Sequence, residues 1–234
     1  MRDKIKDLVE FYEIIDQLKT KVGGARKLKD CDGRMNWPSR GVYFFMEDGE
    51  VRAESGTGFR ITRVGTHALK TNSKTKIWSR LSQHRGTARS GGGNHRGSIF
   101  RLIVGTAIMK KENLDYQTWG QGSSAPREIR EGEQTLECAV SKVIGDMPFL
   151  WLAIEDAAEP NSLRGYIERN TIALLSNANT ETLDPPSGNW LGHLCNRERV
   201  RQSALWNQNH VSETFDPAFL SVFRRLVDEM DVAP

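Results

Sequence analysis

Near both ends of the chain, apolar residues recur at the three- and four-residue spacing of an amphipathic helix. Residues 4–22 carry one such stripe, and Gly23-Gly24 supplies a stop signal after it. Near the C-terminus, Asp216 fits an N-cap and Pro217 the first helical position ahead of a second stripe. The same spacing predicts further helices at residues 75–85, 134–144, 163–174 and 197–205.

Short runs rich in β-branched and aromatic residues predict strands between these helices. They cover residues 41–46, 59–65, 99–107 and 147–154. Residues 86–98 and 111–134 are glycine-rich or polar, which favours loops. The pattern therefore predicts an α/β (α+β) fold, in which a small, mostly antiparallel central sheet is flanked by helices.

The composition is that of an ordinary globular domain, with 38% apolar and 27% charged residues in 234 positions. No apolar stretch approaches a membrane span, and no signal peptide is visible at the N-terminus. The three cysteines form neither a disulfide framework nor a metal knuckle. We therefore expect a single domain over residues 1–234, located in the cytoplasm and without membrane contact.

Charge is distributed unevenly along the chain. Residues 55–111 hold none of the 30 acidic residues. The basic residues in this segment are Arg60, Arg63, Lys70, Lys74, Lys76, Arg80, Arg85, Arg89, Arg96, Arg101, Lys110 and Lys111. A polyanionic partner gives a reason to exclude carboxylates, because each would repel phosphate. The segment indicates nucleic-acid binding; a solvated basic face and a surface for an acidic protein are the alternatives.

One pair of side chains and one single carboxylate in the predicted helices suit phosphate chemistry. Arg80 and His84 are four residues apart and share a helix face, where Arg can clamp a phosphate and His can move a proton. Glu168 lies in mid-helix, where a carboxylate could bind Mg²⁺, which keeps several waters and takes one or two carboxylates. The alternative for Glu168 is an exposed ion pair with Arg164, one turn earlier.

Tyr43 alternates with apolar neighbours on the first predicted strand. Its side chain therefore faces away from those of Val42 and Phe44. Most strand tyrosines are packing residues, but a phenol near cations can orient or deprotonate a water molecule.

The order of these residues resembles the GIY-YIG nuclease superfamily over residues 41–180. Gly41-Val42-Tyr43 matches the first motif and Arg63-Val64-Gly65 the second, followed by a helical Arg80 and a helical Glu168. The spacing of Arg80 and His84 is similar to that of the branch containing Type II restriction enzymes. Residues 1–40 and 181–234 would then be flanking helical additions.

The match departs from the superfamily pattern in several places. Val42 replaces the Ile of the first motif. Arg63 replaces the tyrosine of the second motif, a residue to which positioning of the water is often assigned. An Asn usually follows the Glu, but Asn177 and Asn179 are out of register. The long separation of the Arg and Glu motifs is consistent with an insertion at about residues 107–147.

The resemblance implies a Mg²⁺-dependent (or Mn²⁺-dependent) DNA endonuclease, most similar to restriction or defence enzymes. Glu168 would bind the single metal ion, and Arg80 would clamp the scissile phosphate. Tyr43 would act as the general base or orient the water, and His84 would take its proton or tune its pKa. Double-stranded DNA is the expected partner, with a cognate methyltransferase. Cutting both strands with one site requires a homodimer, sequential action or reorientation.

Several residues of the basic segment are candidates for nucleic-acid contacts, because Arg and Lys bind phosphate and Asn or Arg can read base edges. They are Arg63, His67, Lys70, Arg85, Arg89, Asn94, His95 and Arg96. The alternative for residues 86–98 is a mobile basic loop. The alternatives for the whole chain are a catalytically impaired nucleic-acid-binding module and a repair or RNA nuclease of the same superfamily.

Overall fold

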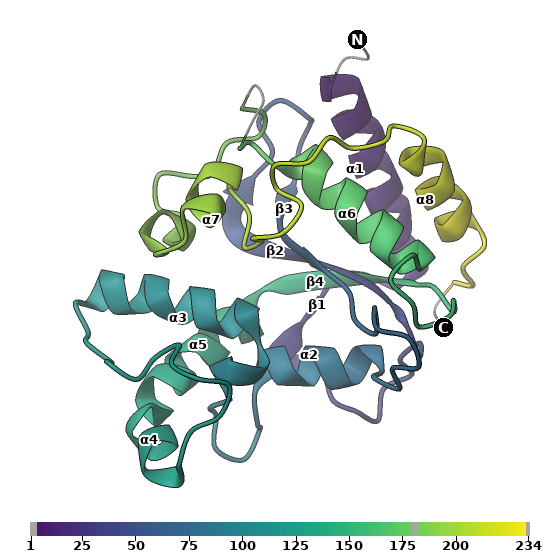
Figure 1. The fold of residues 1–234 in the computed structure, drawn as a ribbon. Coiled ribbons are helices and arrows are strands. Elements are labelled where there is room, and N and C mark those ends of the chain that lie inside the picture. The colour runs from purple at the N-terminus through teal and green to yellow at the C-terminus, as the bar shows by residue number, and fades with distance from the viewer. Residues whose placement is uncertain (1–3, 179–181, 233–234) are drawn as a thin grey trace.

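The computed structural model describes residues 4–178 and 182–232, and in them four strands form one antiparallel sheet (Figure 1). Their order is β1-β4-β2-β3. The strands are β1 (Arg26–Lys27), β2 (Gly41–Val51), β3 (Phe59–Gly65) and β4 (Pro148–Ala153). The start of β2 and the ends of β3 and β4 therefore meet at one end of the sheet, which is where the candidate site lies.

Helices cover both faces of the sheet (Figure 1). One face carries α1 (Lys4–Lys21), α6 (Leu163–Leu175) and α8 (Phe219–Asp228). The other carries α2 (Ile77–Arg85), α3 (Ile99–Glu112) and α5 (Gln134–Asp146). Short helices α4 (Arg127–Gly132) and α7 (Glu198–Ser203) lie at the periphery, and 3₁₀ turns cover Leu28–Asp30, His95–Gly97 and Leu191–Leu194.

Alternation along β2 divides the core between these two layers. Phe44 stacks on Phe223 of α8, with ring centroids 5.7 Å apart. Its neighbour Phe45 packs on the opposite face against Phe100 of α3, at 5.5 Å. Tyr43 shares the face of Phe45, as the sequence predicts, and so points toward α2.

The predicted strand at residues 99–107 is wrong, because this segment is helix α3. The Ser98 side chain accepts a hydrogen bond from the Arg101 amide and caps the helix. Buried residues follow helical spacing at Phe100, Ile103, Val104 and Ala107. The run of Ile and Val suggested a strand, but tertiary packing on α5 decides the conformation.

Other elements follow the sequence with local differences. β3 has the predicted bounds, whereas α2 begins at Ile77, and its N-cap residue Lys76 makes no side-chain cap bond. The predicted N-cap Asp216 is wrong, because α8 begins at Phe219 with Ala218 as its N-cap. Asp216 lies in the turn before the helix, where its carboxylate accepts a hydrogen bond from the Ala218 amide at 3.0 Å. The sequence did not predict the two-residue strand β1 or helix α4, which lie in segments expected to be irregular. The segment expected to be an insertion contains α4 and α5.

The open edge of β3 is covered by a segment from near the C-terminus. The Trp206 amide donates to the Thr62 carbonyl at 2.7 Å. The Asn207 carboxamide accepts from the Val64 amide at 3.1 Å and donates to its carbonyl at 2.9 Å. This side chain therefore satisfies the strand edge much as a neighbouring strand would. No helix of the described residues is long and apolar enough to cross a bilayer.

Candidate active site

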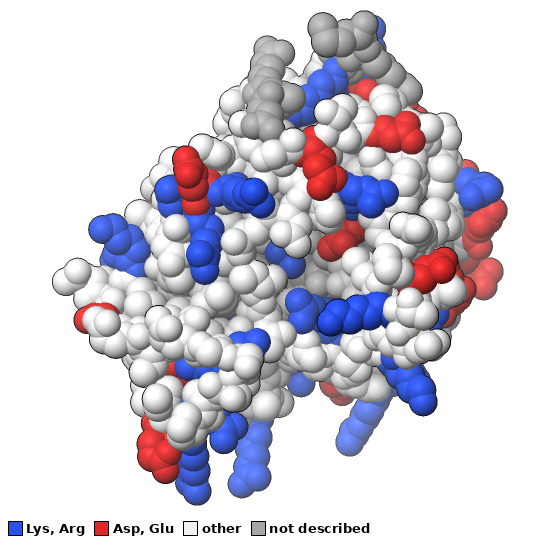
Figure 2. All heavy atoms as spheres, viewed as in Figure 1, with Lys and Arg blue, Asp and Glu red and all other residues white. Residues whose placement is uncertain are grey.

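A cleft of about 710 Å³ opens at the end of β3, between α2 and α6. Its lining includes Glu168 of α6, Arg80 of α2 and Arg63 of β3. Figure 2 shows Lys and Arg side chains around a hollow in the middle of this face. The lining continues through the loop after β3, which contributes His67 and Lys70. The cleft thus combines one carboxylate with several cationic groups.

Two glycines set the packing around Tyr43. Tyr43 and Gly65 are register partners across β2 and β3. A Cβ atom at Gly65 would lie 2.5 Å from the Tyr43 phenol oxygen, which is too close for any side chain. A Cβ at Gly41 would lie 2.2 Å from the Leu152 carbonyl oxygen. The glycines of both sequence motifs are therefore required by close approach of neighbouring groups.

Tyr43 forms a buried hydrogen-bond chain with α2 and the start of α3. Its phenol oxygen is 2.9 Å from Nε2 of His84, and Nδ1 of His84 is 2.7 Å from the Ser98 hydroxyl. Burial holds the pKa of His84 well below its ordinary value, and the nearby Arg80 and Arg63 lower it further. His84 is therefore a neutral imidazole.

Glu168 presents its carboxylate to the cleft from α6. Its Oε1 accepts a hydrogen bond from the Thr66 amide at 3.1 Å, which ties the helix to the end of β3. Its second oxygen has no hydrogen-bond partner among the described residues and is not sealed from solvent. Burial raises the pKa of Glu168. Among the groups that act to lower it, the Arg63 cation has the largest effect.

One carboxylate open to a cleft fits Mg²⁺, which binds one or two carboxylates and keeps several waters. Within residues 4–178 and 182–232, no group of three or more His, Cys, Asp or Glu side chains is arranged to hold a metal ion. An all-protein metal cage is therefore not formed by these residues. The fit is to a hydrated ion that Glu168 and a substrate phosphate would share.

Arg80 and His84 lie on one face of α2, as their spacing predicts. The Arg80 guanidinium donates to the Gly97 carbonyl and to Gln83 Oε1, both at 3.0 Å. These contacts hold it at the mouth of the cleft, where it is only partly buried. A partly exposed guanidinium in this place is able to bind a phosphate oxygen.

Arg63 lies where the superfamily pattern has tyrosine, and it is 7% exposed. Its guanidinium donates to the Trp206 carbonyl and lies 5.1 Å above the Phe100 ring. Burial lowers the pKa of Arg63, and the neighbouring Tyr43 phenol and Glu168 carboxylate oppose that shift. Arg63 therefore places a positive charge beside both groups.

The structure brings only some of the proposed nucleic-acid contacts to the cleft, namely Arg63, His67 and Lys70. His67 is 6% exposed, and neither ring nitrogen has a hydrogen-bond partner among the described residues. Burial and the neighbouring Arg164 lower its pKa to about 4, so the ring is neutral.

The remaining candidates lie elsewhere, in contacts within the protein. His95 is paired with Glu137 at 2.9 Å, and Arg96 with Glu133 at 2.6 Å. Arg85 donates to the Cys31 carbonyl, and Asn94 accepts from the Arg96 amide. Arg89 is exposed on the loop after α2. These contacts keep the loop at 86–98 folded onto α5, although its exposed residues remain accessible.

Three residues at or behind the cleft could not be identified from the sequence. Asn207 and His210 line it from the segment that covers β3, which carries no motif. Ser98 binds His84 from the N-cap of α3. The role of Ser98 as an N-cap was not predicted, because the segment after it was expected to be a strand. Asn179 lies outside the described residues.

A GIY-YIG domain family model matches residues 2–233. The chain therefore belongs to the GIY-YIG nuclease superfamily, whose domains are generally endonucleases and thus hydrolases. No curated protein and no solved structure matches the chain.

Proposed function

We propose that this protein is a Mg²⁺-dependent (or Mn²⁺-dependent) endonuclease that cuts double-stranded DNA as a restriction or defence enzyme. The observation that carries the proposal is the convergence of Arg63, Arg80 and Glu168 at one basic cleft, with the buried Tyr43–His84 pair beside Arg63. Phosphodiester hydrolysis needs an activated water, positive charge near the phosphate and stabilisation of the leaving oxygen. These groups can supply each requirement.

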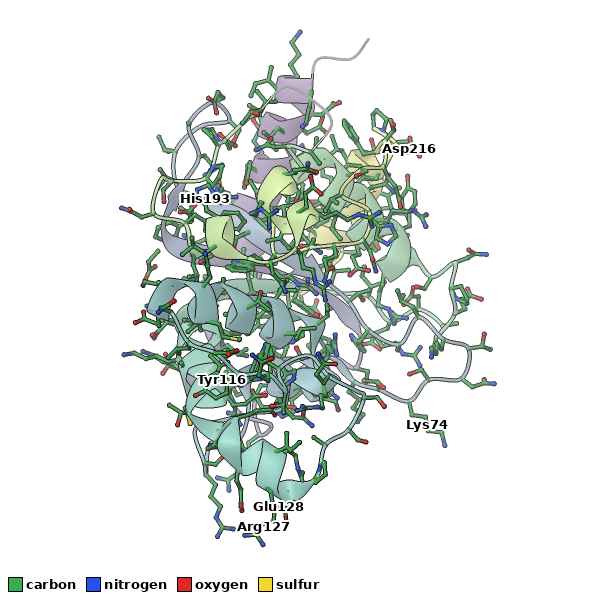
Figure 3. All side chains as sticks on the ribbon, turned by 60° about the vertical axis from the view of Figure 1, so that its left-hand side comes forward. Lys74, Tyr116, Arg127, Glu128, His193 and Asp216 are labelled. Carbon is green, nitrogen blue, oxygen red and sulfur yellow. The ribbon has the colours of Figure 1, made fainter. Side chains whose placement is uncertain are left out.

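The roles follow from the positions of the side chains. Tyr43 accepts the proton of the attacking water, with the charge of Arg63 beside its oxygen. Arg80 at the cleft mouth clamps the scissile phosphate. Glu168 would bind the metal ion, which when bound supplies Lewis acidity toward the phosphate and the leaving oxygen. Lys70 and the exposed Lys74, which points outward from the loop before α2 (Figure 3), contact flanking phosphates.

One observation favours a second candidate, a nucleic-acid-binding module without cleavage activity. Tyr43 is 0% exposed and is not among the cleft-lining residues. The attacking water reaches its oxygen only if a neighbouring side chain, such as Arg63, moves when DNA binds. A repair or RNA nuclease would use the same groups and is distinguished by its substrate alone.

The test is an assay of supercoiled plasmid and a mixed DNA library with Mg²⁺, Mn²⁺ or EDTA. Wild type should cut only with the metal ion, and Glu168→Gln should bind DNA but leave it intact. Glu128→Gln, at an exposed site on α4 remote from the cleft (Figure 3), is the matched control and should cut normally. Binding without cleavage by wild type on every sequence would favour the second candidate.

The same cleavage assay tests the proposed substrate, the cognate methyltransferase and the joint action of two copies. Discrete fragments would indicate recognition of a sequence, and protection of the DNA by base methylation would support a cognate methyltransferase. Cleavage of RNA in preference to DNA would contradict the restriction role. Dependence of double-strand cutting on protein concentration would indicate that two copies act together.

A further inference from the structure

Ser98 joins the candidate site to the beginning of α3. It is 1% exposed, and its hydroxyl oxygen accepts the Arg101 amide at 3.3 Å. The same oxygen lies 2.7 Å from Nδ1 of His84. It is therefore both a helix cap and the partner of the ring nitrogen that does not face Tyr43.

The hydrogen atoms of this chain fit two arrangements. If Nδ1 of His84 carries the proton, the Ser98 hydroxyl hydrogen has no acceptor among the described residues, and Tyr43 donates to Nε2. If Nε2 carries the proton, Ser98 donates to Nδ1 and Nε2 donates to the Tyr43 oxygen. Among the described residues, the hydrogen without an acceptor is then that of the Tyr43 phenol.

These two unpaired hydrogens differ chemically. A serine hydroxyl keeps its hydrogen at any relevant pH, whereas a general base must lose its own before it can act. The Arg63 cation beside the Tyr43 oxygen compensates the charge that loss creates. In the reactive form Tyr43 is a phenolate. With the proton on Nε2, His84 and Arg63 both face the phenolate oxygen as donors, and no hydrogen of the chain is left without an acceptor among the described residues. The arrangement with the proton on Nδ1 does not reach this state.

We propose that Ser98 is a positioning residue that donates its hydroxyl hydrogen to Nδ1 of His84 and so fixes the proton on Nε2, facing Tyr43. His84 then acts as a hydrogen-bond donor to the Tyr43 oxygen and does not receive its proton. The surrounding cations Arg63, Arg80 and Arg101 are consistent with this, because they disfavour an imidazolium. The catalytic consequence of this proposal rests on the proposed nuclease function. The position of the proton on His84 does not depend on that function.

The consequence for the reaction is a defined proton path. The Tyr43 proton leaves to solvent, and the phenolate oxygen later forms an O–H bond with a hydrogen of the attacking water. As that water O–H bond breaks, its oxygen bonds to phosphorus and the bond from phosphorus to the leaving 3′ oxygen breaks. That oxygen takes a proton from solvent. His84 donates a hydrogen bond throughout and keeps its proton.

The test measures the nitrogen chemical shifts of ¹⁵N-labelled His84 in the whole protein, with His84→Gln used to assign the signal. Wild type should show an unprotonated Nδ1 and a protonated Nε2. Ser98→Thr, which keeps a hydroxyl and an N-cap, should give the same shifts and similar cleavage. Ser98→Asp keeps the N-cap but offers only an acceptor, so it should place a proton on Nδ1 and lower cleavage by at least about tenfold.

The outcomes separate the two proposals. An unprotonated Nε2 in wild type would overturn the role of Ser98 whatever the activity. If the His84 nitrogen shifts are as expected but the protein cuts no nucleic acid, the nuclease function is refuted. The assignment of the His84 proton to Nε2 then still holds. If Ser98→Asp does not fold, as judged by its amide spectrum, wild type and Ser98→Thr decide the matter. Unchanged cleavage in a folded Ser98→Asp whose Nδ1 is protonated and whose Nε2 is unprotonated would contradict the catalytic consequence.

Discussion

Tyr43 and Gly65 face each other across β2 and β3, and the phenol ring occupies the space that a side chain at Gly65 would need. We therefore predict that Gly65→Ala displaces the ring and its bond to His84. Unfolding free energy should fall by about 1–3 kcal/mol, as for other overpacked interiors, and cleavage should fall much more than DNA binding. Chemical denaturation and plasmid cutting measure the two effects.

The control for this change is Gly132→Ala on α4. A Cβ at Gly132 meets nothing within 4 Å among the described residues, so stability and cleavage should be preserved. Full activity of a folded Gly65→Ala protein would show that the position of the Tyr43 ring does not matter for the reaction.

The charge of Arg63 is one of the features by which this site departs from the superfamily pattern. If that charge supports the Tyr43 oxygen, Arg63→Lys should retain more activity than Arg63→Gln. The neutral variant should lose roughly 10²-fold in kcat, the size typical of one lost charge-stabilising donor. Single-turnover cleavage at saturating protein separates this loss from weaker DNA binding, and equal rates for both variants would contradict the role.

Two buried histidines should make folding sensitive to acid. The pKa of His67 is lowered to about 4 and that of His84 well below its ordinary value, chiefly by burial. The unfolded chain takes up protons below pH ~6.5 while the folded protein does not, so stability should fall as pH drops from there toward 4.

Replacement of one histidine isolates its share of this effect. His67→Gln should remove about 1–3 kcal/mol of the loss of stability between neutral pH and pH 4. Urea unfolding at a series of pH values measures it. A pH dependence that is identical in wild type and His67→Gln would mean that His67 titrates normally in the folded protein.

Lys70 and Lys74 lie on the loop between β3 and α2, whereas Arg127 lies on α4, away from this loop (Figure 3). The logarithm of DNA affinity should fall linearly with the logarithm of salt concentration. Lys70→Ala and Lys74→Ala should each reduce the slope by about one. Arg127→Ala should leave it unchanged; an equal effect of all three would indicate diffuse attraction without a defined DNA path.

Residues fixed by local periodicity were predictable from the sequence. Alternation placed Tyr43 on the face opposite Phe44, and helical spacing placed Arg80 and His84 together. The segment 99–107 shows the limit, because its Ile and Val residues suit a strand and a helix alike. Its packing on α5 decides between them, and that packing is a long-range property.

The pairing of charges was not predictable. His95 and Arg96 suggested a nucleic-acid contact because their own segment lacks carboxylates, but Glu137 of α5 and its N-cap residue Glu133 pair with them. Asn207 is similar, since nothing in its local sequence indicates that its amide binds the edge of β3. Such partners are far apart in the chain and become neighbours only on folding.

The carboxamide of Asn207 has a consequence for any attempt to shorten the protein. Residues 206–210 protect the β3 edge and also form one wall of the cleft. A fragment that stops at residue 180 would keep every motif residue yet expose the backbone of β3 to other chains. Any unit able to carry this site as a monomer therefore extends past residue 210 to include α8, whose Phe223 stacks on Phe44 in the core, and fusion partners belong beyond that helix.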